Sequence, residues 1–358
     1  MMISVRQSGD SVIIGADVGG TDIKRGLSSR AGDPLSDTLT ISKLPSLVRE
    51  GPAKTIEQIE IAVRELLEQN PGTALGAIGV ACAGNISRQG EVLQSANFGD
   101  TWRKFPLKTQ LEERFKVPVV CENDANAAAI AEHRELAKES VVLAQGPGIL
   151  LTIGTGLGTG MFNGEGKLER GAHGLAVEFG HTAMRATAKS SVDLIKENVV
   201  CGCGQISCAE QYTTLSFIER ELFARQNENP THELYAIPNR RDAAKRVLGK
   251  AIEGDPFCLS IIDSQAMNLG LFMGELIRAH DPMWVLIGGG ITEASDALRY
   301  RYMRKLLQKV EYLVSKDKLD QVKVDYAVLG DNAGWVGASI SASQLLAQMA
   351  EQEKCWPI

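Results

Sequence analysis

Basic residues are in the minority in this chain, and long hydrophobic runs are missing. Lysine and arginine number 38 against 44 acidic residues, which gives a formal charge of −6. A surface that follows the phosphates of a nucleic acid needs a basic excess, so we expect no nucleic-acid partner. No apolar run reaches the ~20 residues that span a bilayer, and the first ten residues, MMISVRQSGD, lack the apolar core of a signal peptide. We therefore expect a cytoplasmic protein without a membrane partner.

Cysteines are also too few and too scattered for a disulfide framework. Four of the seven, namely Cys82, Cys121, Cys258 and Cys355, lie far apart in the sequence. An odd total fits reduced thiols together with a metal site. Apolar residues at 44% and charged residues at 23% are ordinary for a soluble globular protein. A length of 358 residues predicts about two domains, at ~150 residues each.

The other three cysteines gather close to a histidine. Cys201, Cys203 and Cys208 lie within eight residues, and His181 precedes them. Three thiolates and one imidazole suit a closed tetrahedral Zn²⁺ site, which binds tightly but leaves no open position for chemistry. Reactive groups must then lie beside the metal, and the candidates are Glu178 and Glu210, which flank it. The alternative reading of these glutamates is as surface charges or as partners that orient the histidine.

The segment from Ser11 to Leu27 predicts a hairpin with a Gly-Gly-Thr turn. Gly19 and Gly20 let the backbone approach a ligand closely, and free N–H groups there suit phosphate oxygens. Asp17, just before the turn, could hold Mg²⁺ through water. A tight turn preceded by an aspartate is the alternative.

Strands and helices alternate along the rest of the chain, which predicts an α/β fold. We expect helices at 55–69, 107–115, 212–227, 241–254, 256–280 and 333–349, and strands at 77–83, 117–121, 284–287 and 322–327. Glu122, Asn123 and Asp124 follow one of these strands and open an alanine-rich helix. Such strand ends usually carry the ligands of α/β folds. A helix cap is the alternative, but it explains only one residue of this polar cluster.

A second glycine-rich turn lies in Gly148–Gly160. It departs from the dinucleotide fingerprint because Thr159 stands where the third glycine belongs, and it lacks the Gly-Lys-Ser/Thr ending of a P-loop. It resembles the first hairpin instead, so the two together suggest a duplicated, two-lobed nucleotide clamp, with a plain glycine-rich hairpin as the alternative. Three further glycines, Gly288, Gly289 and Gly290, follow a strand and could lie against a flat ring or a phosphate.

These pieces, in this order, resemble the Repressor–ORF–Kinase (ROK) family of the sugar-kinase and actin-like ATPase fold. The resemblance runs from Ile14 to about Ala347. The motifs that carry it are DVGGTDIK, ENDANAAA, TIGTGLGTG, GAHGLAVEFGH, CGCGQISCAE and VLIGGGI. It implies two α/β lobes with a cleft between them, in a ribonuclease H-like fold. We expect an N-terminal lobe of residues 1–124, completed by the C-terminal helix 333–358, and a larger lobe of residues 125–332 with the zinc-binding motif.

The resemblance implies ATP- and Mg²⁺-dependent phosphorylation of a hexose, with Asp124 as catalytic base. The implied sugar contacts are Asn123, Asp124, Glu178, His181, Glu210 and Gly84. The implied nucleotide contacts are Asp17, Gly19, Gly20, Thr21, Lys24, Gly154, Thr155, Gly156, Gly288, Gly289 and Gly290. The implied zinc ligands are His181, Cys201, Cys203 and Cys208, with the ion acting as a structural brace. Kinases of this family often form homodimers, and we expect one here.

This sequence departs from the family's pattern in three places. Ser207 replaces the glycine that usually precedes the third cysteine, which predicts a strained turn. The gap between His181 and Cys201 is longer than usual, so we expect an extra surface element at 185–200. Residues 81–84 stand where many members carry a proline-containing loop near the sugar, which affects substrate identity.

Among the hexoses we expect glucose, phosphorylated at the 6-hydroxyl, and two other readings compete with such a glucose kinase. Within the kinases, N-acetylmannosamine, N-acetylglucosamine, fructose and allose are alternative substrates, because these sugars differ from glucose at single groups. In another class stands a non-catalytic sugar-binding or regulatory protein. The family's DNA-binding repressors carry a helix-turn-helix domain before the kinase-like part, and the sixteen residues before Asp17 are too few for one.

Overall fold

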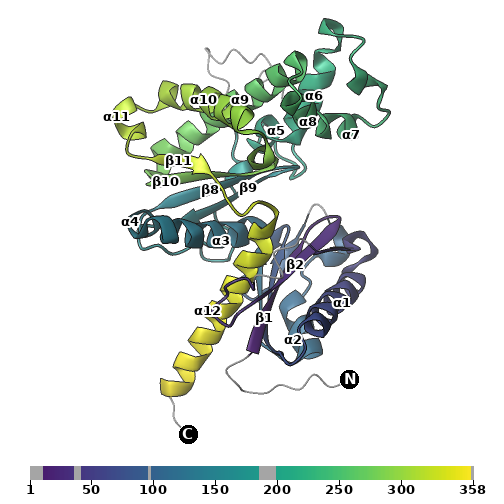
Figure 1. The fold of residues 1–358 in the computed structure, drawn as a ribbon, viewed down its shortest axis with the longest axis vertical. Helices are drawn as coiled ribbons and strands as arrows, with labels where there is room; N and C mark the ends of the chain where they lie inside the picture. Colours follow the sequence, from purple (N-terminus) through teal and green to yellow (C-terminus); the bar gives the residue numbers. More distant parts are fainter. Residues whose placement is uncertain (1–10, 36–41, 96–97, 185–198, 356–358) are drawn as a thin grey trace. The chain divides into compact units, whose positions relative to one another are not determined.

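The computed structural model describes residues 11–35, 42–95, 98–184 and 199–355. Contacts divide the chain into two compact units (Figure 1). Unit 1 comprises Met1–Ala144, Leu168–Val177 and Asp331–Ile358, and unit 2 comprises Gln145–Lys167 and Glu178–Gly330. Among the described helices, none combines the length and apolarity that a membrane crossing requires. The surface element predicted at 185–200 lies, apart from its last two residues, outside the described part of the chain.

Unit 1 is built on a five-stranded sheet of order β3-β2-β1-β4-β7. Its strands are β1 (Ser11–Val18), β2 (Asp22–Ser28), β3 (Ser42–Pro45), β4 (Ala74–Cys82) and β7 (Val119–Asn123). β1 and β2 form the predicted antiparallel hairpin, whereas β4 and β7 run parallel to β1. A small antiparallel ribbon, β5 (Asn85–Ile86) with β6 (Val92–Gln94), follows β4. Both predicted strands of this region are confirmed, with β4 starting three residues earlier than predicted and β7 ending two residues later.

The alternation of side chains along β1 assigns different helices to the two faces of this sheet. Val12, Ile14 and Ala16 share a core with the helices α1 and α2. Ile13, on the opposite face, packs with Ala342 of the last helix. The helices of unit 1 are α1 (Pro52–Gln69), α2 (Leu107–Phe115), α3 (Asp124–Glu139), α4 (Val141–Ala144) and α12 (Ala333–Cys355). In Figure 1, α12 runs alongside β1.

Glycines allow α12 to lie directly on the sheet and on α3. A Cβ atom on Gly79 of β4 would come within 1.9 Å of the carbonyl oxygen of Ala338. A Cβ atom on Gly337 of α12 would come within 1.7 Å of the carbonyl oxygen of Ala127 in α3. Real Cβ atoms do not approach this closely, so these positions require glycine. The small residues therefore fix α3, and with it the start of that helix, against the sheet.

Unit 2 repeats this topology with a four-stranded sheet of order β11-β10-β8-β9. Its strands are β8 (Gly148–Ile153), β9 (Leu157–Phe162), β10 (Trp284–Gly289) and β11 (Lys323–Tyr326). β8 and β9 form an antiparallel hairpin, and β10 and β11 follow in parallel. The order β9-β8-β10-β11 matches β2-β1-β4-β7 in unit 1. The two glycine-rich hairpins thus occupy equivalent places in two similar sheets.

Helices cover the sheet of unit 2 and contain most of its core. They are α5 (Glu210–Thr213), α6 (Leu215–Ala224), α7 (Arg240–Lys245), α8 (Val247–Ile252), α9 (Pro256–His280), α10 (Asp296–Leu313) and α11 (Lys316–Leu319). The helix predicted at 256–280 is confirmed as α9. The single helices predicted at 212–227 and 241–254 are wrong, since each is two short helices. Thr214 interrupts the first because its side chain accepts the N–H of Ser216 and caps a new helix.

Candidate active site

Asn123 and Asp124 lie at the junction of β7 and α3 in unit 1. Asn123 caps α3, since its side-chain oxygen accepts the N–H of Asn126 at 3.1 Å. Its amide donates to the carbonyl oxygen of Gly84 at 3.0 Å and to Oδ1 of Asp124 at 3.1 Å. Oδ1 of Asp124 also accepts the N–H of Ala125 at 2.9 Å. The hydrogen bonds from Asn123 and Ala125 both reach Oδ1 of Asp124 and not Oδ2. The helix cap is therefore Asn123, and capping does not account for Asp124.

A second carboxylate lies close to Asp124. Burial raises the pKa of Asp17 to about 7, and the charge of Asp124 adds to that shift. Burial likewise raises the pKa of Asp124. Two neighbouring carboxylates that are both difficult to ionise form a place where a cation is favourable, and carboxylate and water oxygens are the ligands of Mg²⁺. The donor set fits that ion.

Lys24 lies opposite Asp17 in the β1–β2 hairpin. Its amine donates to Asp331 at 2.8 Å, and the same carboxylate accepts Lys43 at 3.1 Å. The charge of Lys24 lowers the pKa of Asp17, but by less than burial and Asp124 raise it. At the turn between the strands, the N–H of Gly19 closes the hairpin by donating to the carbonyl oxygen of Asp22 at 2.9 Å. The two other turn residues, Gly20 and Thr21, are exposed.

Glu122 organises the same junction, although the sequence did not assign it a role. The residue is buried, at 7% exposure. Oε1 accepts the N–H of Asn123 and the side-chain amide of Asn126, both at 3.2 Å. Oε2 accepts Nε of Arg170 at 2.8 Å and its terminal nitrogen at 2.6 Å. One buried carboxylate thus joins the start of α3 to the segment 168–177. The polar Glu-Asn-Asp motif was a sequence signal that Glu122 has a structural role. Its ion-pair partner Arg170 lies too far along the chain to be recognised from the sequence.

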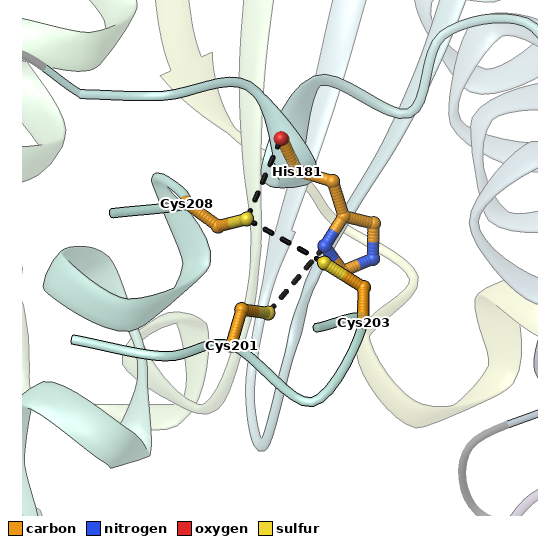
Figure 2. Close-up of side chains that lie close together, drawn as sticks. All are labelled: His181, Cys201, Cys203 and Cys208. Atoms are coloured by element: carbon orange, nitrogen blue, oxygen red, sulfur yellow. Dashed lines mark hydrogen bonds between the residues drawn. The ribbon is translucent and has the colours of Figure 1, made fainter. Parts of the chain in front are cut away.

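The predicted metal ligands of unit 2 point toward one another (Figure 2). Sγ of Cys201 lies 3.6 Å from Nδ1 of His181, and the sulfur atoms of Cys203 and Cys208 lie 3.6 Å apart. All four ligand atoms lie within 4.8 Å of one another. Tetrahedral Zn²⁺ with ordinary bond lengths separates its ligands by about 3.5–3.8 Å. The cluster therefore fits a zinc ion in both ligand type and spacing.

The turn that carries the third cysteine is strained as expected. Ser207 has a φ angle of 62°, in the left-handed region that favours glycine. Its hydroxyl accepts the phenol of Tyr212 at 3.2 Å, and its backbone pairs with Met184 at 2.9 Å. The strain leaves Cys208 in place beside the other ligands.

Glu210 connects the cysteine cluster to the glycine-rich turn of unit 2. It is the first residue of α5, directly after the cluster. Cys201 donates to Oε1 at 3.5 Å, and the N–H of Leu157 donates to Oε2 at 3.1 Å. A Cβ atom on Gly156 would come within 2.7 Å of Oε2, so this position has little room for a side chain. Glu178 differs, because it is exposed and contributes its carbonyl oxygen to the N–H of His181 at 3.0 Å.

The remaining predicted nucleotide contacts meet at one end of the sheet of unit 2. Gly288 and Gly289 pair with the last residues of β8, immediately before the turn. Gly289 has a φ angle of 99°, and a Cβ atom there would come within 2.0 Å of the carbonyl oxygen of Ile153. The predicted residues at this edge are Gly154, Thr155, Gly156, Gly288, Gly289 and Gly290. Gly288 is buried, whereas Gly154 and Gly290 are exposed and let a ligand approach the backbone. The side chain of Arg241 donates to the carbonyl oxygen of Thr155 at 3.4 Å.

Comparison with known proteins identifies a family whose model matches most of this chain. The model of the ROK family matches residues 13–345. A glucokinase of Streptomyces coelicolor is 33% identical over 338 residues, which covers 91% of this chain and 96% of the relative. A glucokinase of Halalkalibacterium halodurans is 30% identical, over 92% of this chain and 94% of its own.

A solved structure resembles the chain at a similar sequence identity. It is a ROK family glucokinase from Streptomyces griseus in complex with glucose and AMPPNP. The two chains share 30% identity and a TM-score of 0.75, over 93% of this chain and all of the other. The two-lobed fold of the sugar kinases and actin-like ATPases, expected from the motifs, is confirmed by this likeness.

Proposed function

The chain belongs to the ROK family, and we propose that it is an ATP-dependent hexokinase that phosphorylates glucose at the 6-hydroxyl. Its relatives at about 30% identity over nine-tenths of the chain are glucokinases. The observation that carries the proposal is the start of α3, where Asn123 caps the helix and donates to Oδ1 of Asp124, so that Oδ2 is the oxygen proposed to meet the substrate.

Asp124 is the proposed general base. A sugar hydroxyl is a poor nucleophile until it loses its proton, and Oδ2 is the oxygen that would accept it. The raised pKa of Asp124 makes it a stronger base than an exposed aspartate. Asn123 and the buried Glu122 are positioning residues, because they fix the backbone and the orientation of the Asp124 side chain.

Asp17 is the proposed Mg²⁺ residue of unit 1. The ion would neutralise charge on the phosphates, which is the main requirement of phosphoryl transfer. The glycine turn of each unit would offer backbone N–H groups to phosphate oxygens. In unit 1 these are Gly19, Gly20 and Thr21, with Lys24 beside them, and in unit 2 they are Gly154, Thr155 and Gly156. The adenosine would lie against Gly288, Gly289 and Gly290.

Zinc is the proposed brace of the sugar-binding loop. With Nδ1 of His181 turned toward Cys201, the other ring nitrogen points away from the sulfur atoms (Figure 2) and can bind a sugar hydroxyl. The proposed sugar contacts are Asn123, Asp124, Glu178, His181, Glu210 and Gly84. The hydrogen bond from Leu157 to Glu210 supports this reading, because it ties a sugar-binding glutamate to the phosphate turn. We further propose a cytoplasmic homodimer.

The second candidate is a non-catalytic sugar-binding protein. It is favoured by one observation, the Ala-Cys-Ala-Gly sequence at 81–84 where many relatives have a proline-containing loop. A coupled assay of ADP release separates the two candidates. Glucose should stimulate ADP release from ATP, with one glucose 6-phosphate formed per ADP. Glucose binding without ADP release would show that the protein binds sugar without phosphorylating it, which is the second candidate.

A panel of hexoses in the same assay ranks the substrates. We expect glucose to give the highest kcat/KM, above N-acetylmannosamine, N-acetylglucosamine, fructose and allose. An N-acetylated sugar in first place would retain the reaction class but change the proposed substrate.

A further inference from the structure

A second group of metal-ligand side chains lies in unit 2, outside all the residues assigned above. Nε2 of His232 lies 3.3 Å from Oδ2 of Asp255 and 4.0 Å from Sγ of Cys258. The three ligand atoms all lie within 4.8 Å of one another. A tetrahedral zinc ion places nitrogen and oxygen ligands about 3.3 Å apart and nitrogen and sulfur ligands about 3.6 Å apart. The group therefore approaches the spacing of one ion before any ion is bound.

Two helix starts hold these side chains in place. Asp255 caps α9, since its Oδ1 accepts the N–H of Cys258 at 2.7 Å. This leaves Oδ2 for the imidazole. His232 caps the short helix Glu233–Ala236, since its Nδ1 accepts the N–H of Leu234 at 3.3 Å. The backbone thus positions Asp255 and the ring of His232, and an ion on Nε2 would break the hydrogen bond from Leu234.

The surroundings of the group are apolar on one side and open on the other. The imidazole packs against the rings of Tyr235 and Phe257, at centroid distances of 6.1 Å and 5.3 Å. The side chain of His232 is 6% exposed, and Cys258 is fully buried. Asp255 is 28% exposed and offers the route of entry. Apolar surroundings lower the local dielectric constant and so strengthen charge interactions among the three side chains.

Without a metal, hydrogen bonds orient the imidazole. Nδ1 of His232 accepts the N–H of Leu234, so Nε2 is the ring nitrogen that donates to Asp255. Burial, together with a hydrogen bond to Asp255, raises the pKa of Cys258 to about 12. The thiol is therefore protonated and unreactive, which excludes a nucleophilic role for it.

We propose that His232, Asp255 and Cys258 bind one thiophilic divalent cation, with Zn²⁺ as the preferred ion. Binding releases one proton, from the thiol of Cys258. The ring proton of His232 moves from Nε2 to Nδ1, at the loss of the long hydrogen bond from Leu234. The thiolate and the carboxylate then balance the two positive charges, and water fills the fourth position. With only three protein ligands, this site is open, unlike the four-ligand cluster at Cys201.

Metal counting on the full-length protein tests the proposal. The protein is stripped with a chelator, equilibrated with buffered Zn²⁺ in the micromolar range, and analysed for zinc per chain. Asp255→Asn is the informative variant, because asparagine caps a helix as well as aspartate does but is a much weaker metal ligand. Cys258→Ser removes the thiolate with little change in volume. Cys121→Ser, at a buried thiol of unit 1, is the matched control.

We expect both Asp255→Asn and Cys258→Ser to hold one zinc ion fewer per chain than the wild type, and Cys121→Ser to hold the same number. The difference should persist in a Cys203→Ala background, which separates this site from the first cluster. Because the variants take up one zinc ion fewer, they should also release one proton fewer per chain than the wild type. Equal zinc content in wild type and variants, with equal melting temperatures in chelator, would overturn the proposal.

Discussion

Replacing Asp124 with asparagine tests the proposed base without disturbing the start of α3. The asparagine retains an oxygen where Oδ1 accepts the N–H of Ala125 at 2.9 Å and the amide of Asn123 at 3.1 Å. The change is confined to Oδ2, which becomes an amide nitrogen and can no longer accept a proton. The cap of α3 belongs to Asn123 and is unaffected.

The expected loss of turnover follows from the role of a general base. Such a group contributes ~10²–10⁴-fold to a rate, which corresponds to about 3–5 kcal/mol of transition-state stabilisation. The kcat of Asp124→Asn should fall by this factor. The dissociation constant for glucose should change only a few-fold, because the amide can still form a hydrogen bond with the sugar.

Coupled ADP release at saturating ATP and glucose measures kcat, and calorimetry measures glucose binding. Glu135→Gln is the matched control, since it changes another carboxylate of α3 to an amide. Glu135 pairs with the exposed Lys138 at 2.8 Å, and such surface pairs contribute little. A kcat for Asp124→Asn within three-fold of wild type would refute the assignment of the base.

Four further outcomes follow from the structure. Cys203→Ala, or removal of zinc by a chelator, should lower the melting temperature and weaken glucose binding at least ten-fold, because the loop that holds the sugar loses its brace; unchanged melting and binding would contradict the zinc proposal. Asp17→Asn should raise the melting temperature of the metal- and nucleotide-free protein at pH 8 but not at pH 4. The native pKa of about 7 lies above the ordinary value of 3.8, so between these pH values the native state holds a proton that the unfolded state has lost. The free energy of unfolding therefore falls, by up to about 4 kcal/mol, as the pH rises from about 4 through 7; a pH-independent difference would exclude this cause. Gly337→Ala should destabilise unit 1 by about 1–3 kcal/mol in denaturant titrations, because its Cβ would collide with the carbonyl of Ala127, and an unchanged midpoint would refute the close packing of α3. Glu122→Gln should lower kcat more than it raises KM for glucose, because it weakens the support of Asp124; an effect on KM alone would assign Glu122 to sugar binding.

Patterns that are local in the sequence predicted most of the fold. Strong periodicity and clear end signals, as in α9 with its N-terminal Asp-Pro and its Asp-Pro end, gave boundaries that agree with the structure. The hairpin of β1 and β2 was recognisable because its Gly-Gly turn lies between two apolar strands. The breaks at Thr214 and Arg246 were not recognisable from the sequence. Neither residue is a helix breaker, and apolar residues at helical spacing lie on both sides of each.

The candidate site was predictable where its residues are close in sequence or have a distinctive type. The cysteine cluster is one such case, since three thiols within a short segment leave few explanations. The ion pair of Glu122 with Arg170 depends on folding that brings distant segments together, and no spacing rule contains it. The same holds for His232, which meets Asp255 and Cys258 only through the packing of two helix starts.

The most direct test of the proposed reaction is ADP release by the wild-type protein with ATP, Mg²⁺ and glucose, followed together with the formation of glucose 6-phosphate. We expect the two products in a one-to-one ratio, with no ADP released when glucose is omitted. Tight glucose binding with no ADP release above the sugar-free rate would contradict the assignment as a kinase.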